Sequence, residues 1–256
     1  MSHSSSALAE RPWCVALVGN PNCGKTALFN LLTGARQKVA NYAGVTVERK
    51  AGSLRLADGR TVTVFDLPGA YSLAPRSPDE RITRDVLAGT AIGEKRPDLI
   101  VAVVDASRLR RQLRLVLAAQ RLGLPMLVVL NMADRAEQLG RTVDPQRLAE
   151  RLGVPVLGTV ATSGRGVQAL QAALDDPRTW APPAPRPVEA EDPAADARRV
   201  HELLVDLGLD DDAGIEASDR LDHWVLHPVL GPLLLAALLF LMFQAVFAWA
   251  EAPMGW

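Results

Sequence analysis

Apolar residues form short runs that alternate with segments of helical periodicity. The runs lie at 13–18, 52–57, 61–66, 99–105, 126–131 and 154–160. Apolar residues recur at helical spacing near 25–33, 79–92, 108–122, 144–152 and 166–175. Asp58-Gly59 stands between the second and third runs and is a strong hairpin signal, so these two strands are predicted to be antiparallel. The rest of the alternation predicts an α/β fold with a six-stranded, mostly parallel sheet and right-handed crossovers.

The pattern changes after residue 176. Segment 177–193 is rich in Pro and Ala and predicts a linker. Helical spacing returns over 194–209, and we expect a small helical segment over 194–227. No charged residue occurs from Val229 to Ala250. Because about 20 helical residues cross a bilayer, this stretch predicts one transmembrane helix, with a buried core helix as the alternative.

The expected domain organisation follows from these changes. Residues 1–12 lack the apolar region of a signal peptide and predict a disordered tail. The later boundaries are an α/β domain at 13–176, a linker at 177–193, a short helical segment at 194–227, a transmembrane helix at 228–250, and the beginning of a truncated membrane region at 251–256.

Composition excludes some partners. The chain has 28 Lys and Arg against 29 Asp and Glu, a net charge of −1. Its one basic block, Arg108–Arg114, is typical of a solvated helix face, so nucleic acid is not expected as a partner. Cys14 and Cys23 lie on a predicted strand and in a loop, which favours free thiols in a reducing cytosol.

The segment Gly19–Thr26 carries the clearest chemistry. It matches G-x-x-x-x-G-K-[ST], follows the strand at 13–18 and opens the helix at 25–33, which is the context of a phosphate-binding P-loop. Backbone N–H groups at a helix N-terminus bind phosphate; Lys25 is expected at the β and γ phosphates and the Thr26 hydroxyl on Mg²⁺. The predicted nucleotide-binding residues here are Gly19, Asn20, Pro21, Asn22, Cys23, Gly24, Lys25, Thr26 and Ala27.

Two further segments supply the switch residues that a GTPase needs. Asp66 begins D-x-P-G at a strand end, where its carboxylate suits Mg²⁺ and the Gly69 N–H suits the γ phosphate. Thr46 is expected at the second Mg²⁺ position, with an ordinary strand residue as the alternative. The predicted residues are Gly44, Val45, Thr46, Val47, Glu48, Asp66, Leu67, Pro68 and Gly69.

The base is predicted from N-x-x-D at the end of the strand 126–131. The Asp134 carboxylate can accept from N1–H and the exocyclic amine of guanine, a pair that adenine lacks. Met132 stands where such motifs usually have lysine, so apolar packing on the base is expected. A loop at 161–163 is expected near guanine O6. The predicted base-site residues are Asn131, Met132, Ala133, Asp134, Ala161, Thr162 and Ser163.

These motifs resemble the translation-factor-like class of small GTPase domains and, more narrowly, the bacterial ferrous iron transport protein B family. The narrow resemblance is carried by the P-loop, by Asn41–Lys50, by Asp66–Leu73 and by Asn131–Asp134, and it resumes at Ser218–Asp222. It implies a P-loop GTPase domain on the cytoplasmic side of the bacterial inner membrane, with GTP as substrate and Mg²⁺ as cofactor. It also implies that Fe²⁺ passes through a membrane region outside this chain, with small accessory iron-transport proteins as partners.

The hydrolytic residues depart from the common pattern at one position. Ala70 stands where many GTPases have a water-orienting glutamine, so slow intrinsic turnover is expected. The resemblance implies that Asn22 helps to bind an activating K⁺; the alternative is that Asn22 only shapes the loop. The expected catalytic residues are Lys25, Thr46, Asp66, Gly69 and Asn22, with Thr26, Thr46 and Asp66 on Mg²⁺ and Asn22 on K⁺.

Three functions fit the sequence. The first is a GTP-hydrolysing domain that energises or gates Fe²⁺ uptake. The second is a membrane-tethered switch that recruits a partner when GTP is bound. The third is a soluble GTPase for RNA modification or ribosome assembly, which the apolar C-terminal stretch and the missing basic patch disfavour. The family's helical domain resembles a nucleotide-dissociation inhibitor, and the corresponding segment 194–227 is short in this chain.

Overall fold

The computed structural model describes residues 13–34, 37–175, 180, 193–209, 225 and 228–254. The chain divides into two compact units, Met1–Leu209 and Asp210–Trp256. The predicted tail at 1–12 and most of the predicted linker at 177–193 lie outside the described residues, as does nearly all of 210–227.

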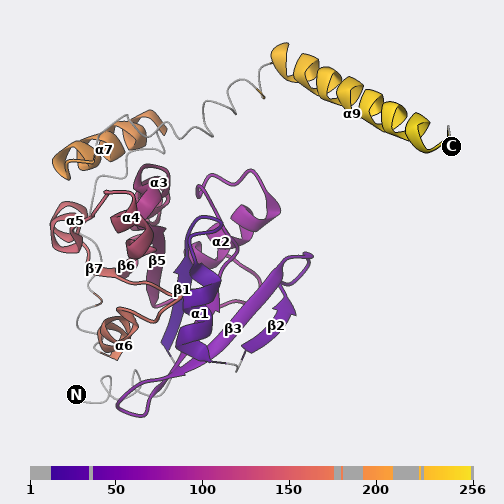
Figure 1. Ribbon diagram of the computed structural model, residues 1–256. Helices are drawn as coiled ribbons and strands as arrows, with labels where there is room; N and C mark the ends of the chain where they lie inside the picture. Colours follow the sequence, from indigo (N-terminus) through magenta and orange to yellow (C-terminus); the bar gives the residue numbers. More distant parts are fainter. Residues whose placement is uncertain are drawn as a thin grey trace, which may run out of the picture. The chain divides into compact units, whose positions relative to one another are not determined.

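One seven-stranded sheet forms the centre of the first unit (Figure 1), in the order β2-β3-β4-β1-β5-β6-β7. Its strands are β1 (Trp13–Val18), β2 (Gln37–Asn41), β3 (Glu48–Arg55), β4 (Thr61–Asp66), β5 (Leu99–Asp105), β6 (Met126–Asn131) and β7 (Val156–Gly158). The strands from β4 through β1, β5 and β6 to β7 are parallel. β2 pairs with β3 and β3 with β4 in antiparallel fashion, so the predicted hairpin at Asp58-Gly59 is confirmed.

The prediction of six strands is wrong, because β2 adds a seventh at the sheet edge. The described side chains of β2, from Lys38 to Asn41, are all exposed. An edge strand without a buried face carries no apolar alternation, so the sequence pattern could not reveal it. β3 also begins earlier than expected, at Glu48, because pairing with β2 extends it.

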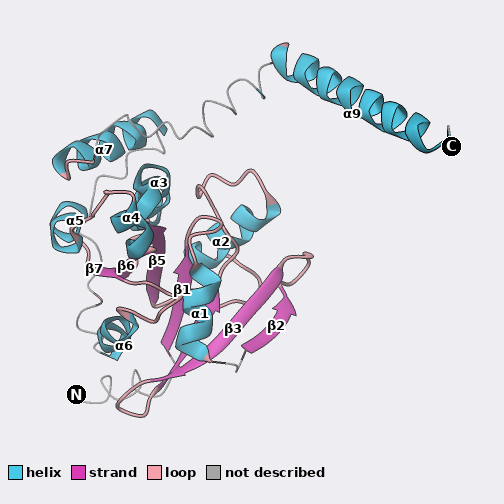
Figure 2. Ribbon diagram, viewed as in Figure 1, coloured by secondary structure: helices cyan, strands magenta, loops and turns pink. Residues whose placement is uncertain are grey.

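Helices cover both faces of the sheet (Figure 2). The helices of the first unit are α1 (Lys25–Thr33), α2 (Pro78–Ala88), α3 (Leu109–Gln120), α4 (Ala133–Gln138), α5 (Pro145–Leu152), α6 (Val167–Asp175) and α7 (Pro193–Asp206), with a 3₁₀ turn η1 at Ala106–Arg108. The short α4 and η1 were not predicted. Apolar residues of α2, α3, α5 and α7 share one core cluster with the sheet, and those of α1 and α6 share another.

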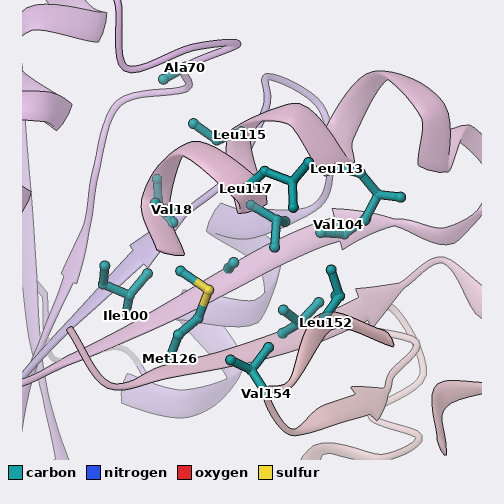
Figure 3. Close-up of a cluster of buried hydrophobic side chains, with 14 of the residues drawn as sticks. Val18, Ala70, Ile100, Val104, Leu113, Leu115, Leu117, Met126, Leu152 and Val154 are labelled. Atoms are coloured by element: carbon teal, nitrogen blue, oxygen red, sulfur yellow. The ribbon is translucent and has the colours of Figure 1, made fainter. Parts of the chain in front are cut away.

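Alternation along the strands divides the core between these two faces. In β1, Ala16 and Val18 belong to the first cluster, and Val15 and Leu17 to the second. Figure 3 shows side chains of the first cluster from β1, β5, β6, α3 and α5. Because successive strand side chains point to opposite faces, the apolar parallel strands must be covered on both sides.

Helix α7 packs on the same unit as the sheet. Its Val200, Leu203 and Leu204 are buried in the first core cluster. Arg121 of α3 forms an ion pair with Asp196, and Arg151 of α5 lies 3.2 Å from Asp206. The helix predicted from the spacing at 194–209 is therefore present, and ion pairs connect it to α3 and α5.

The second unit contains α9 (Leu230–Met254), so a helix forms where the transmembrane segment was expected. Within the described part of the chain, no helix meets the length and hydropathy that a membrane crossing requires. The described side chains of α9 end at Ala245, and about 20 residues are needed to cross a bilayer.

Candidate nucleotide-binding site

The P-loop connects β1 to α1 at the carboxyl end of the central strands. Gly24 has φ 84°, a left-handed conformation that glycine adopts without strain. A Cβ atom at Gly19 would lie 2.4 Å from the carbonyl oxygen of Val103, and one at Gly24 would lie 2.1 Å from Asn131 Nδ2. Both glycines are thus required by close packing of the loop on β5 and β6.

Lys25 and Thr26 converge on one carboxylate. The Lys25 ammonium donates to Asp66 Oδ1 at 2.8 Å, and the Thr26 hydroxyl donates to Asp66 Oδ2 at 2.8 Å. The side chains of Lys25 and Asp66 are only 10% and 4% exposed. The chain thus brings together three of the predicted residues, from the first turn of α1 and the end of β4.

Thr26 and Asp66 fit a bound Mg²⁺ chemically, because hydroxyl and carboxylate oxygens are the hard donors that this ion prefers. Thr46 is not brought to them. It is exposed in the turn between β2 and β3, which the Tyr42 N–H closes by donating to the Val47 carbonyl at 3.0 Å. Gly44 and Val45 lie in the same turn, and Glu48 begins β3.

The D-x-P-G segment packs on the P-loop. The Ala70 N–H donates to the Gly19 carbonyl at 3.2 Å. A Cβ at Gly69 would lie 2.9 Å from Pro21 Cγ, so only glycine fits this approach. Thr83 of α2 donates to the Pro68 carbonyl at 2.9 Å. Gly69 and Ala70 therefore lie directly against the P-loop, and there is no room for a side chain at Gly69.

Glu80 of α2 holds the following loop, and the sequence reasoning missed it. Its carboxylate accepts from the Tyr71 N–H at 3.1 Å and from the Arg76 N–H at 2.9 Å. Ser77 caps α2 by accepting from the Glu80 N–H at 3.2 Å. The spacing S-x-x-E is a capping-box signature, so Ser77 and Glu80 could have been found from it.

Asn131 joins the P-loop to the 161–163 loop. Its Nδ2 donates to the Cys23 carbonyl at 2.9 Å, and its Oδ1 accepts from the Ala161 N–H at 2.9 Å and from the Thr159 hydroxyl at 3.3 Å. Both amide atoms are therefore engaged inside the protein. The Asn131 NH2 group keeps a second N–H, and the half-buried Asp134 is the other polar residue of N-x-x-D.

The remaining predicted residues surround these contacts. Met132 has φ 58°, and its Cε would lie 3.6 Å from a Cβ at Gly24, so its side chain reaches over the P-loop. Ala133 is half-buried in the first turn of α4, and Ala161 is buried. Thr162 and Ser163 are exposed, as is Ala27 in α1.

Two asparagines and a cysteine complete the loop. Asn22 is exposed with φ 64°, so its side chain is free to reach an ion beside the phosphates. Asn20 is buried, and its Nδ2 donates to the Arg111 carbonyl of α3 at 3.5 Å. Burial raises the pKa of the Cys23 thiol to about 11, so the thiol stays protonated at neutral pH. Cys23 therefore serves packing and not chemistry.

Comparison with protein families and curated proteins supports this reading of the motifs. The model of ferrous iron transport protein B matches residues 13–174. The Fe(2+) transporter FeoB of Salmonella typhimurium is 50% identical over 166 residues, which are 63% of this chain and 21% of the relative. A fusion of Fe(2+) transport protein A with Fe(2+) transporter FeoB, from Porphyromonas gingivalis, is 47% identical over 156 residues, or 61% of this chain and 18% of the relative.

Solved structures give the same result. A GDP-bound point mutant of the S. thermophilus FeoB G-domain superposes with a TM-score of 0.59 at 40% identity, covering 67% of this chain and 64% of the other. The cytosolic domain of L. pneumophila FeoB gives 0.61 at 36% identity, covering 82% and 87%. The chain spans about a fifth of the length of the curated relatives it matches. By the match over residues 13–174 and the P-loop GTPase fold, the chain belongs to the ferrous iron transport protein B family.

Proposed function

We propose that this chain binds GTP and GDP at the P-loop and hydrolyses GTP with Mg²⁺. The observation that carries the proposal is the Asp66 carboxylate, which accepts from both Lys25 and Thr26 at 2.8 Å. The residues proposed to bind phosphate and Mg²⁺ thus lie together at one helix N-terminus, a place where anions bind.

The proposed hydrolysis uses positioning and electrostatics. The P-loop N–H groups and Lys25 hold the phosphates, and the oxygens of Thr26 and Asp66 would hold Mg²⁺, with Thr46 as a further ligand. When bound, the ion neutralises charge on the phosphate oxygens. Gly69 offers its N–H to the γ phosphate. Because Ala70 cannot orient water, we expect slow intrinsic turnover.

Two further assignments deepen this proposal. Asn22 would bind a K⁺ that stimulates hydrolysis, and its exposure and left-handed backbone support the assignment. Asp134 would select guanine, with Met132 packing on the base face. The half-buried Asp134 supports this, because its carboxylate lies in the first turn of α4 beside the Asn131 bridge.

The biological role is proposed from the relatives. A protein named Fe(2+) transporter FeoB is 50% identical to this chain over 166 residues. We infer that the domain at 13–176 lies on the cytoplasmic side of the bacterial inner membrane, and that its GTP hydrolysis energises or gates Fe²⁺ uptake through a separate membrane region. The fusion with Fe(2+) transport protein A supports a small accessory protein as a partner.

Nucleotide competition tests the proposal. The full chain is loaded with a fluorescent GDP analogue, and unlabelled GTP, GDP, ATP and ADP are titrated with Mg²⁺ present. We expect the guanine nucleotides to displace the probe at least about 100-fold more effectively than the adenine nucleotides. Equal displacement by ATP and GTP would contradict the proposed function.

A further inference from the structure

The turn that carries Thr46 is fastened at its beginning by a buried tyrosine. Tyr42 is 3% exposed and belongs to the first core cluster, together with Ala51 and Phe65. Its backbone N–H closes the turn onto the Val47 carbonyl at 3.0 Å. Its hydroxyl is buried and has no hydrogen-bond partner among the described residues. Since buried hydroxyls are normally paired, this hydroxyl disfavours the position that the turn now occupies.

The other end of the turn is fastened by an ion pair. Arg49, the second residue of β3, places its guanidinium 4.7 Å above the Phe65 ring. Its Nε lies 2.5 Å from Glu94 Oε1, and the two side chains are 26% and 10% exposed. The Nε–H is not directed at that oxygen, so the contact is an ion pair without a hydrogen bond. Glu94 lies in the segment between α2 and β5, outside the switch.

The Glu94 carboxylate interacts electrostatically with both Arg49 and the Tyr42 hydroxyl. Burial raises the pKa of the Tyr42 hydroxyl above its usual range, and the nearby Glu94 carboxylate raises it further, while Arg49 lowers it. The Tyr42 hydroxyl is therefore neutral at physiological pH. We name these three residues, the buried Tyr42 and the half-buried Arg49 and Glu94, the switch latch.

Two latch residues, Tyr42 and Arg49, stand before and after Thr46 in the chain. Asp66 pairs in register with Lys50, four residues after Thr46. With both ends of the 42–47 turn fixed, Thr46 remains exposed instead of joining Thr26 and Asp66. We propose that Tyr42, Arg49 and Glu94 are positioning residues that hold the 42–47 turn in its present place, and that Thr46 can reach a bound Mg²⁺ and the γ phosphate of GTP only when this latch opens. The proposal rests on the proposed GTPase function.

Two conservative substitutions should change the latch in opposite directions. Glu94→Gln removes the charge that attracts Arg49 and keeps the side-chain shape, so it weakens the latch. Tyr42→Phe removes the unpaired hydroxyl and keeps the ring, so it strengthens the latch. Neither residue is among those assigned to the phosphates or the base. A purely structural role would not give shifts of opposite sign.

The test measures the affinities of the full chain for GDP and for GTPγS with Mg²⁺. For Glu94→Gln we expect GTPγS to bind about fivefold more tightly, because less free energy is spent on opening the latch. For Tyr42→Phe we expect GTPγS to bind about threefold more weakly. GDP, which lacks the γ phosphate, should keep its affinity within about twofold in both variants. Glu202→Gln, which changes the exposed Arg199–Glu202 pair of α7, is the matched control and should change neither affinity.

The outcomes separate this proposal from the proposed function. Failure of the unsubstituted chain to bind GDP would contradict the GTPase assignment itself. If the unsubstituted chain binds GDP and GTPγS, an unchanged ratio of the two affinities in both variants overturns the latch. Shifts of the same sign in both variants, or equal losses for GDP and GTPγS, overturn it as well.

Discussion

The two halves of the nucleotide site differ in how firmly they are built. On the phosphate and base side, the P-loop and the N-x-x-D segment follow the central parallel strands β1 and β6, and Asn131 bonds the P-loop to the 161–163 loop. On the switch side, the 42–47 turn joins β2 and β3 at the sheet edge, and Thr46 is exposed. Loops at the ends of central strands are fixed from both sides, whereas an edge hairpin moves without breaking the sheet. We therefore expect binding and switching to be carried by different parts of one sheet.

The largest expected effect concerns the phosphate and base side of the site, which we call the fixed half; the switch side is the moving half. Asp134→Asn replaces an acceptor by a donor, so we expect GTP affinity to fall about 100- to 1,000-fold and xanthosine triphosphate to become the preferred nucleotide. Competition against a fluorescent GDP analogue measures both changes. Glu137→Gln changes a neighbouring exposed carboxylate of α4 and should leave the preference for guanine unchanged. A variant at Asp134 that still prefers GTP would remove this residue from the base site.

Lys25→Ala should have the next largest effect. It removes the ammonium that holds the phosphates and leaves Asp66 without its buried ion pair. Because a hydrogen bond to a charged group contributes about 1.5–3 kcal/mol, we expect GTP affinity to fall about 10- to 100-fold, with turnover falling too. Isothermal titration and phosphate release measure these quantities. Lys38→Ala, on the exposed edge strand, serves as control and should retain both.

The dependence of the hydrolysis rate on K⁺, which we assign to Asn22 of the P-loop, should be a smaller effect. We expect K⁺ to accelerate hydrolysis at least about tenfold over Na⁺, a modest part of the factor that an arginine finger supplies. Steady-state rates in KCl and NaCl at matched ionic strength measure it. Asn22→Ala should abolish the difference. A variant that kept its response to K⁺ would take the cation role from Asn22.

Alkaline stability reports on the phosphate and base side alone. Burial raises the pKa of the thiols from 9.0 to about 12 at Cys14 and to about 11 at Cys23. Above pH 9 the unfolded chain loses thiol protons that the folded chain keeps. Stability is therefore complete below pH 9 and falls as the pH rises toward 11, by up to about 1.4 kcal/mol per pH unit for each thiol. Urea titrations at pH 8, 9 and 10 should show a steeper loss for the unsubstituted chain than for a Cys14→Ala, Cys23→Ala variant, and equal slopes would contradict this.

The sequence predicted the fixed half far better than the switch half. The apolar parallel strands and the P-loop pattern are local signals, so Lys25, Thr26 and Asp66 could be placed together in advance. The edge strand β2 has no buried face, and only its pairing with β3 defines it. The contacts of Arg49 with Glu94 and of Glu80 with Tyr71 join residues that no periodicity relates. Asn131 was expected at the base, and only tertiary packing shows that its amide also bonds the P-loop to the 161–163 loop.

Thiol labelling of the switch turn tests the central claim most directly. Both native cysteines are buried and protonated, so a cysteine introduced by Ala43→Cys in the exposed turn should be the reactive one toward iodoacetamide at pH 8. We expect rapid labelling without nucleotide and with GDP. Labelling should be at least about fivefold slower with GTPγS and Mg²⁺, because the latch then opens and the turn moves inward onto the phosphates. The same labelling rate in all three states, with GTPγS shown to be bound, would contradict the division between a fixed half and a moving half.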